Sequence, residues 1–141
     1  MEKVINHGNR KEKGLTLVET IIALAIITTV SLATVSIVVY SSNALRNTAV
    51  KAFFNHETDT LSNIYLSYHD DADSYGKAMK QYSGAEVTLG EDRSLYYDGK
   101  FNHTAVETSM YALLLDFDAD RLLLKVSDNN GKSIMDKEAR A

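Results

Sequence analysis

The first half of the chain is dominated by one long apolar run. From Thr20 to Tyr40 no residue is charged, and most side chains are aliphatic. At 1.5 Å per residue this run is about 30 Å long as a helix, which matches the hydrocarbon core of a bilayer. The chain has no proline, and no glycine occurs between Gly14 and Gly76. Because nothing breaks it, we expect one helix over about residues 15–68.

After Tyr40 the apolar residues recur at helical spacing, so this half of the helix should pack one face on a domain. Charged residues such as Glu57 fall largely off the apolar face. That face consists of two stripes, first Leu45, Ala49, Ala52 and Phe53, then Leu61, Ile64, Tyr65 and Tyr68.

Hydroxyl side chains are frequent in the apolar run and have two interpretations. They could bend the helix by bonding to carbonyls one turn earlier, or they could let neighbouring helices approach closely. The sequence does not choose between these alternatives. The residues concerned are Thr28, Thr29, Ser31, Thr34 and Ser36.

The second half of the chain changes to a strand period. After a short helix over residues 75–82, apolar and polar residues alternate in several short segments separated by turn signals such as Asn130-Gly131. We expect strands at 85–89, 94–97, 100–103, 111–117, 122–126 and 133–135, with turns at Asp98-Gly99 and Asp118-Ala119-Asp120 and a frayed end over 136–141. The fold class is therefore α+β: a long helix packed on a small antiparallel sheet of about four strands.

One acidic residue stands near the start of the apolar run. The segment reads Gly14-Leu15-Thr16-Leu17-Val18-Glu19 and follows a short basic leader. A carboxylate inside a bilayer costs about 2.5–3.5 kcal/mol or more, so an acid there indicates a function. The pattern resembles the class III signal of type IV pilins and pseudopilins, in which a glycine precedes the cut and glutamate is the fifth residue of the mature chain.

This resemblance covers about residues 11–40 and implies specific roles. A prepilin peptidase would cleave between Gly14 and Leu15 and methylate the new amine of Leu15. Glu19 would then act in assembly by meeting the amine of a neighbouring subunit. The resemblance implies a pilin-like fold with a cleaved leader at 1–14, a membrane and assembly helix at 15–41, a head at 42–135 and a flexible tail at 136–141.

The composition of the chain excludes some classes of function and leaves others without support. The chain has 141 residues, no cysteine and a net charge of −4, so neither disulfides nor thiolate chemistry is available. An acidic head gives no electrostatic support for nucleic-acid binding. The basic residues precede the apolar run, which predicts a cytoplasmic N-terminus and an exterior head.

Other candidate sites are weaker. Asp116, Asp118 and Asp120 have the spacing that opens a calcium loop, but the glycine and glutamate of an EF-hand are missing, so a solvated turn is the better interpretation. His69 with the nearby aspartates is better explained as a solvated helix end. No motif indicates an enzyme, a metal centre or a cofactor.

We therefore expect a structural subunit that is processed by a prepilin peptidase, inserts in the cytoplasmic membrane and joins other pilin subunits in a surface filament. A minor pilin of an adhesive or motile pilus is favoured. The alternatives are a pseudopilin of a type II secretion or DNA-uptake apparatus and, in a different class, a single-span surface domain that never assembles. An ordinary secretory signal does not fit, because its apolar core would be shorter.

Overall fold

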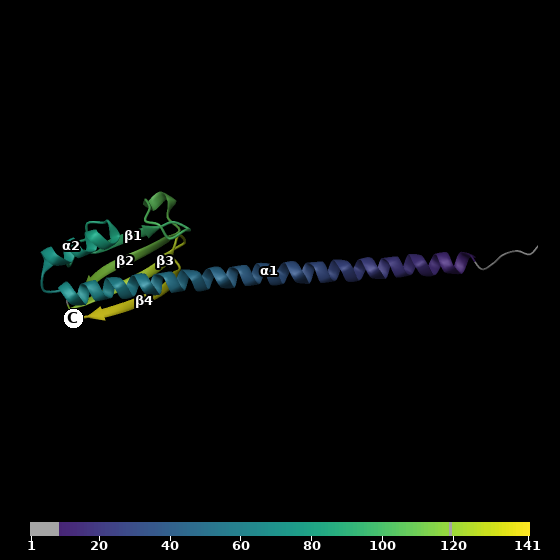
Figure 1. Cartoon of the computed structure of the whole chain (residues 1–141), viewed down its shortest axis with the longest axis horizontal. Helices are drawn as coiled ribbons and strands as arrows, with labels where there is room; N and C mark the ends of the chain where they lie inside the picture. Colours follow the sequence, from purple (N-terminus) through teal and green to yellow (C-terminus); the bar gives the residue numbers. More distant parts are fainter. Residues whose placement is uncertain (1–8, 119) are drawn as a thin grey trace, which may run out of the picture. The chain divides into compact units, whose positions relative to one another are not determined.

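A computed structural model describes the backbone of residues 9–118 and 120–141, with side chains from Thr16 onward. The chain divides into two compact units, Met1–Arg46 and Asn47–Ala141. The elements are α1 (Asn9–Tyr68), α2 (Ala72–Ser83), β1 (Arg93–Tyr97), the 3₁₀ turn η1 (Val106–Thr108), β2 (Tyr111–Asp118), β3 (Arg121–Asp128) and β4 (Ser133–Arg140) (Figure 1). This order confirms the predicted α+β, pilin-like arrangement with its long helix and four-stranded sheet.

The first unit is the exposed, apolar part of α1. Every described side chain from Thr16 to Arg46 is exposed, including Leu24, Ile27 and Leu32. Among the described residues, one helix is long and apolar enough to cross a membrane. This part of the chain therefore has no core of its own.

The hydroxyl groups in this segment bond to the helix itself. Thr28 Oγ1 donates to the carbonyl of Ala25 at 2.9 Å, and Ser31 Oγ donates to that of Ile27 at 2.7 Å. Thr20, Thr29, Thr34 and Ser36 make bonds of the same kind. The helix continues without a break through these residues, so the back-bonds satisfy the hydroxyls and leave the segment helical.

The second unit is built on an antiparallel sheet with the strand order β1-β2-β3-β4. The register pairs Leu113 with Val126 and Leu115 with Leu124. Because side chains alternate across a strand, these four residues share one face, and all four are fully buried. The predicted strands at 111–117 and 122–126 are confirmed.

One hydrophobic core joins this face to the helices. Phe54 and Leu61 of α1 and Tyr75 and Met79 of α2 are all fully buried. The ring centroid of Phe54 lies 5.4 Å from that of Tyr97 and 5.5 Å from that of Tyr111. The core consists of Val50, Phe54, Leu61, Tyr65, Tyr75, Met79, Val87, Leu95, Tyr97, Tyr111, Leu113, Leu115, Leu122, Leu124, Val126 and Ala139.

The first predicted stripe on the helix was wrong for three of its four residues, and only Phe53 packs against the core, where it is half-buried. Leu45 is 71% exposed, and Ala49 and Ala52 are exposed as well. The buried face follows Val50 and Phe54 instead, because the Phe54 ring fills the space between the aromatic side chains of the sheet, which an alanine methyl cannot do. In the second stripe Leu61 and Tyr65 are buried as predicted, whereas Tyr68 is exposed.

Two predicted strands do not form. Residues 85–89 lie between Gly84 and Gly90, whose φ angles are 70° and 86°, and only Val87 is buried in the core. These left-handed residues stop a strand at both ends. Residues 100–103 form a turn in which Phe101 has a φ of 66°, so that only an isolated bridge between Tyr97 and His103 remains of the predicted hairpin.

The predicted frayed tail was also wrong. β4 runs to Arg140, and its register pairs Ala139 with Leu122. Ala139 is 6% exposed, because its methyl group lies on the apolar face of the sheet beside Leu122. Residues 136–140 are therefore part of the sheet, although most of their side chains are charged or polar. The predicted turn at 118–120 includes residue 119, which lies outside the described residues.

Candidate processing and assembly site

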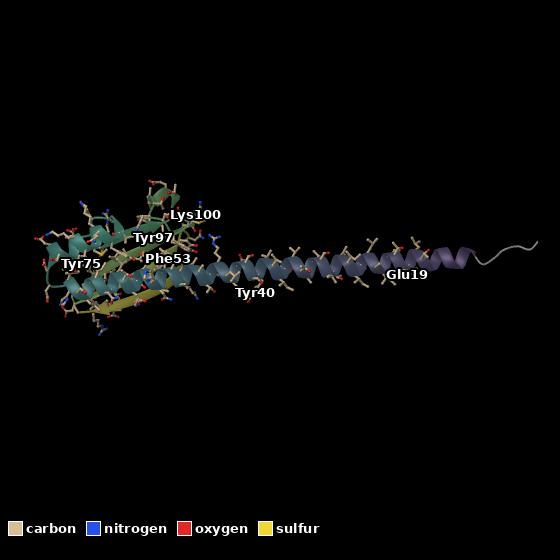
Figure 2. All side chains as sticks on the ribbon, viewed as in Figure 1. Glu19, Tyr40, Phe53, Tyr75, Tyr97 and Lys100 are labelled. Carbon is tan, nitrogen blue, oxygen red and sulfur yellow. The ribbon has the colours of Figure 1, made fainter. Side chains whose placement is uncertain are left out.

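The three residues of the predicted processing and assembly site lie on α1. Glu19 is the only one whose side chain the structure describes, and it is exposed (Figure 2). Gly14 and Leu15 fall within the helical range, but the Leu15 side chain lies outside the described part of the chain. The nitrogen of Leu15 and the side chain of Glu19 are four residues apart, which is about one helical turn.

Glu19 differs from the other polar groups in the apolar run. Within residues 20–39, every threonine and serine hydroxyl donates to a helix carbonyl three or four residues earlier. The Glu19 carboxylate has no hydrogen bond or ion pair to another described residue. A carboxylate needs a donor or a cation when it leaves water. In a bilayer or a packed helix bundle, that partner has to come from outside the described chain.

The three aspartates considered for calcium are not gathered into a cation site. Asp116 pairs with Lys125 at 2.6 Å, and Asp118 pairs with Arg121. The described residues hold no group of three or more histidines, aspartates and glutamates placed to bind a metal ion. The structure therefore gives the calcium alternative no support.

The prediction that Glu57 lies off the buried face of α1 was wrong. Its side chain is buried, at 9% exposure. The hydroxyl of Tyr82 in α2 donates to Oε1 at 2.8 Å, and that of Tyr97 in β1 donates to Oε2 at 3.2 Å. One carboxylate thus links two helices and a strand. The tyrosines follow Glu57 by 25 and 40 residues, a separation that no local pattern could have signalled.

The environment of this carboxylate also acts on the tyrosines. Burial raises the pKa of Tyr97, and the nearby Glu57 carboxylate raises it further. Burial and the hydrogen bond to Glu57 likewise raise the pKa of Tyr82. Both hydroxyls therefore stay protonated and available as donors, so the group acts as a structural hydrogen-bonded link within the head.

Comparison with known proteins matches the N-terminal part of the chain. Residues 9–35 match the family model described as the prokaryotic N-terminal methylation motif. No curated protein and no solved structure matches the chain. The matched range contains Gly14, Leu15, Glu19 and most of the apolar run. The chain therefore carries the class III signal of the type IV pilins and pseudopilins. This motif supports processing by a prepilin peptidase, and the helix that carries it is long and apolar enough to cross a membrane.

Proposed function

We propose that this chain is a non-enzymatic structural subunit, cleaved between Gly14 and Leu15 and assembled as a minor pilin into a type IV pilus. The observation that carries the proposal is Glu19, an exposed carboxylate that has no partner among the described residues, in an apolar helix whose hydroxyls from Thr20 onward donate to helix carbonyls. Such a group is costly unless assembly supplies its partner.

Cleavage supplies a suitable partner. It creates a positively charged amine at Leu15, one helical turn from Glu19. When the apolar helices of a filament pack together, they form a medium of low dielectric in which opposite charges attract strongly. The carboxylate of an incoming subunit pairs with the methylated amine of a subunit already in place. This pairing neutralises both charges and sets the axial register.

The basic leader supports a cytoplasmic N-terminus before cleavage. Residues 1–14 carry one arginine and three lysines against two glutamates. Positive charge next to a membrane span is retained on the cytoplasmic side. The head then lies outside the membrane, where its own core makes it stable before assembly.

The preference for a minor pilin over a pseudopilin comes from the modest size of the chain, the lack of cysteine and the sequence that opens the mature helix. The alternatives differ in location. A minor pilin is recovered in sheared surface filaments, a pseudopilin remains in a short structure in the envelope, and an anchored surface domain is found in neither.

The intact mass of the protein recovered from sheared filaments tests the proposal. We expect a chain that lacks residues 1–14 and carries one additional methyl group. Gly14→Val should retain the leader and stay in the membrane, whereas the matched leader variant Gly8→Val should be cleaved normally. A filament subunit that retains residues 1–14 would contradict the proposal.

A further inference from the structure

The outer edge of β1 is only half covered. β1 is an edge strand of the sheet. The N–H of Thr104 donates to the carbonyl of Tyr96 at 3.0 Å, and the N–H of Asp98 donates to that of Asn102 at 2.9 Å. Residues 102–104 thus begin a fifth strand beside β1. They do not continue it, because the chain turns into η1 from Val106.

The uncovered half presents main-chain hydrogen-bonding groups. In an antiparallel ladder the N–H and C=O of one residue point to the same side, and the side alternates along the strand. The carbonyl of Tyr96 bonds to Thr104 and therefore points away from β2. The N–H of Tyr96 and both main-chain groups of Ser94 point the same way. Among the described residues, none of these three groups has a hydrogen-bond partner.

A hollow of about 630 Å³ lies along this edge. It is lined by three segments: Ser83–Ala85 at the end of α2, residues 92–96, and His103 with Thr104. Because three segments surround it, the hollow suits one extended chain better than the edge of a second sheet. Its charges are balanced, since Asp92 and Arg93 are of opposite sign and the Asp92 carboxylate accepts the N–H of Phe117 at 2.9 Å. An ionic ligand therefore finds no net attraction there.

We propose that this hollow binds an extended segment of a partner polypeptide, which completes the fifth strand that residues 102–104 begin. The N–H of Ser94, the C=O of Ser94 and the N–H of Tyr96 form a donor–acceptor–donor series along this edge. A peptide strand that pairs with a sheet edge binds to such a series. The side of the hollow formed by Ser83–Ala85 carries small, uncharged residues, and the Ser83 hydroxyl already donates to the carbonyl of Met79 at 2.8 Å. The bound segment therefore carries small, uncharged side chains toward Ser83–Ala85 and polar side chains toward solvent. This binding is separate from assembly through Glu19.

The test uses the full chain, ¹⁵N-labelled in detergent micelles, and a capped peptide of alternating valine and threonine flanked by lysines. We expect the peptide to shift the amide signals of Ser94 and Tyr96 and to slow their hydrogen exchange on the order of tenfold or more. The same peptide, N-methylated along one edge so that it cannot donate, should have no effect.

Two variants of Ser94 serve as the test and its matched control. Ser94→Pro removes an outward N–H at a position where an edge strand tolerates proline, and it should abolish peptide binding. Ser94→Ala keeps the main chain and should bind like the wild type. The proposal is overturned if millimolar peptide leaves both amides unchanged, if the N-methylated peptide binds equally well, or if the shifts map to another surface.

Discussion

The two units of this chain differ in whether they bury their apolar side chains. The head buries its large side chains in a core shared by α1, α2 and the sheet, and residues such as Leu113 and Leu124 are fully inaccessible. The first unit exposes every described side chain, including Val30 at 60% and Ile37 at 65%. Surfaces of this kind mark contact with lipid or with other chains. The head therefore closes its hydrophobic core within this chain, whereas the apolar helix needs lipid or other chains to cover its side chains.

The same contrast applies to the two glutamates of α1. Glu57 is buried in the head and receives two hydroxyl donors from this chain. Glu19 lies in the apolar helix and has no partner among the described residues. An acid that the fold itself satisfies contributes to stability, whereas an acid that it leaves unsatisfied is available for assembly. Substitutions in the two units should therefore affect different measurements.

The largest expected effect is on folding of the head. Leu124→Asp places a charge without a partner in the core, at a cost of several kcal/mol against a total stability of about 5–15 kcal/mol. Thermal unfolding of the full chain in detergent, followed by near-ultraviolet circular dichroism, should lose its cooperative transition. The matched variant Leu66→Asp, at a position 42% exposed, should change the stability by only about 0.5 kcal/mol. Equal behaviour of the two variants would contradict the described core.

A smaller effect is expected at the buried carboxylate. Glu57→Ala leaves the hydroxyls of Tyr82 and Tyr97 without their acceptor, which should cost about 1–3 kcal/mol. Glu57→Gln keeps an acceptor oxygen and should cost less. Chemical denaturation measures both. If alanine were tolerated as well as glutamine, the hydrogen bonds to the tyrosines would contribute nothing to stability.

The smallest effect is on the pH dependence of the head. Backbone N–H bonds, that of Asn102 first, hold the pKa of Asp98 below its ordinary value of 3.8, and the Ser74 hydroxyl does the same for the N-cap residue Asp71. Because both pKa values are lowered on folding, their stabilising contribution is present above that value and is lost as the pH falls through the folded pKa. The unfolding temperature should therefore fall as the pH is lowered below the ordinary pKa of 3.8.

Asparagine variants show which carboxylates cause this fall. Asp71→Asn with Asp98→Asn should make the acid side of the profile shallower, since both residues keep an acceptor but no longer titrate there. Glu91→Gln, at an exposed position, serves as the control and should leave the profile unchanged. An unaltered slope in the double variant would show that other groups govern the acid response.

The elements that the sequence predicted correctly depend on local pattern. Tyr111, Leu113 and Leu115 recur with the period of two that predicts a strand, and the structure buries all three on one face. The lack of proline and glycine after Gly14 fixes the long helix up to Tyr68. In these segments the spacing of the apolar side chains matches the repeat of the backbone conformation, so the element could be predicted without knowledge of contacts to distant residues.

The errors occurred where a distant contact decides the structure. The apolar Leu45, Ala49 and Ala52 looked like a buried stripe, but the sheet takes Val50 and Phe54 instead. Ala139 lies among charged residues that suggest a frayed end, yet pairing with Leu122 holds it in the sheet. The processing and assembly residues stay predictions, because their partners lie outside this chain. The sequence nevertheless indicated a function for Glu19, because it is an acidic residue near the start of an apolar run.

The most direct test of the contrast between the two units is filament entry of Glu19 variants, measured by immunoblotting sheared filaments and membranes. Glu19→Ala should be expressed, inserted and cleaved largely like the wild type, and should unfold at the same temperature, but it should be missing from filaments. Glu19→Asp, which keeps the charge with a shorter reach, should be intermediate. If Glu19→Ala entered filaments at wild-type levels, the pairing role would be wrong, and the single-span surface domain would become the better interpretation.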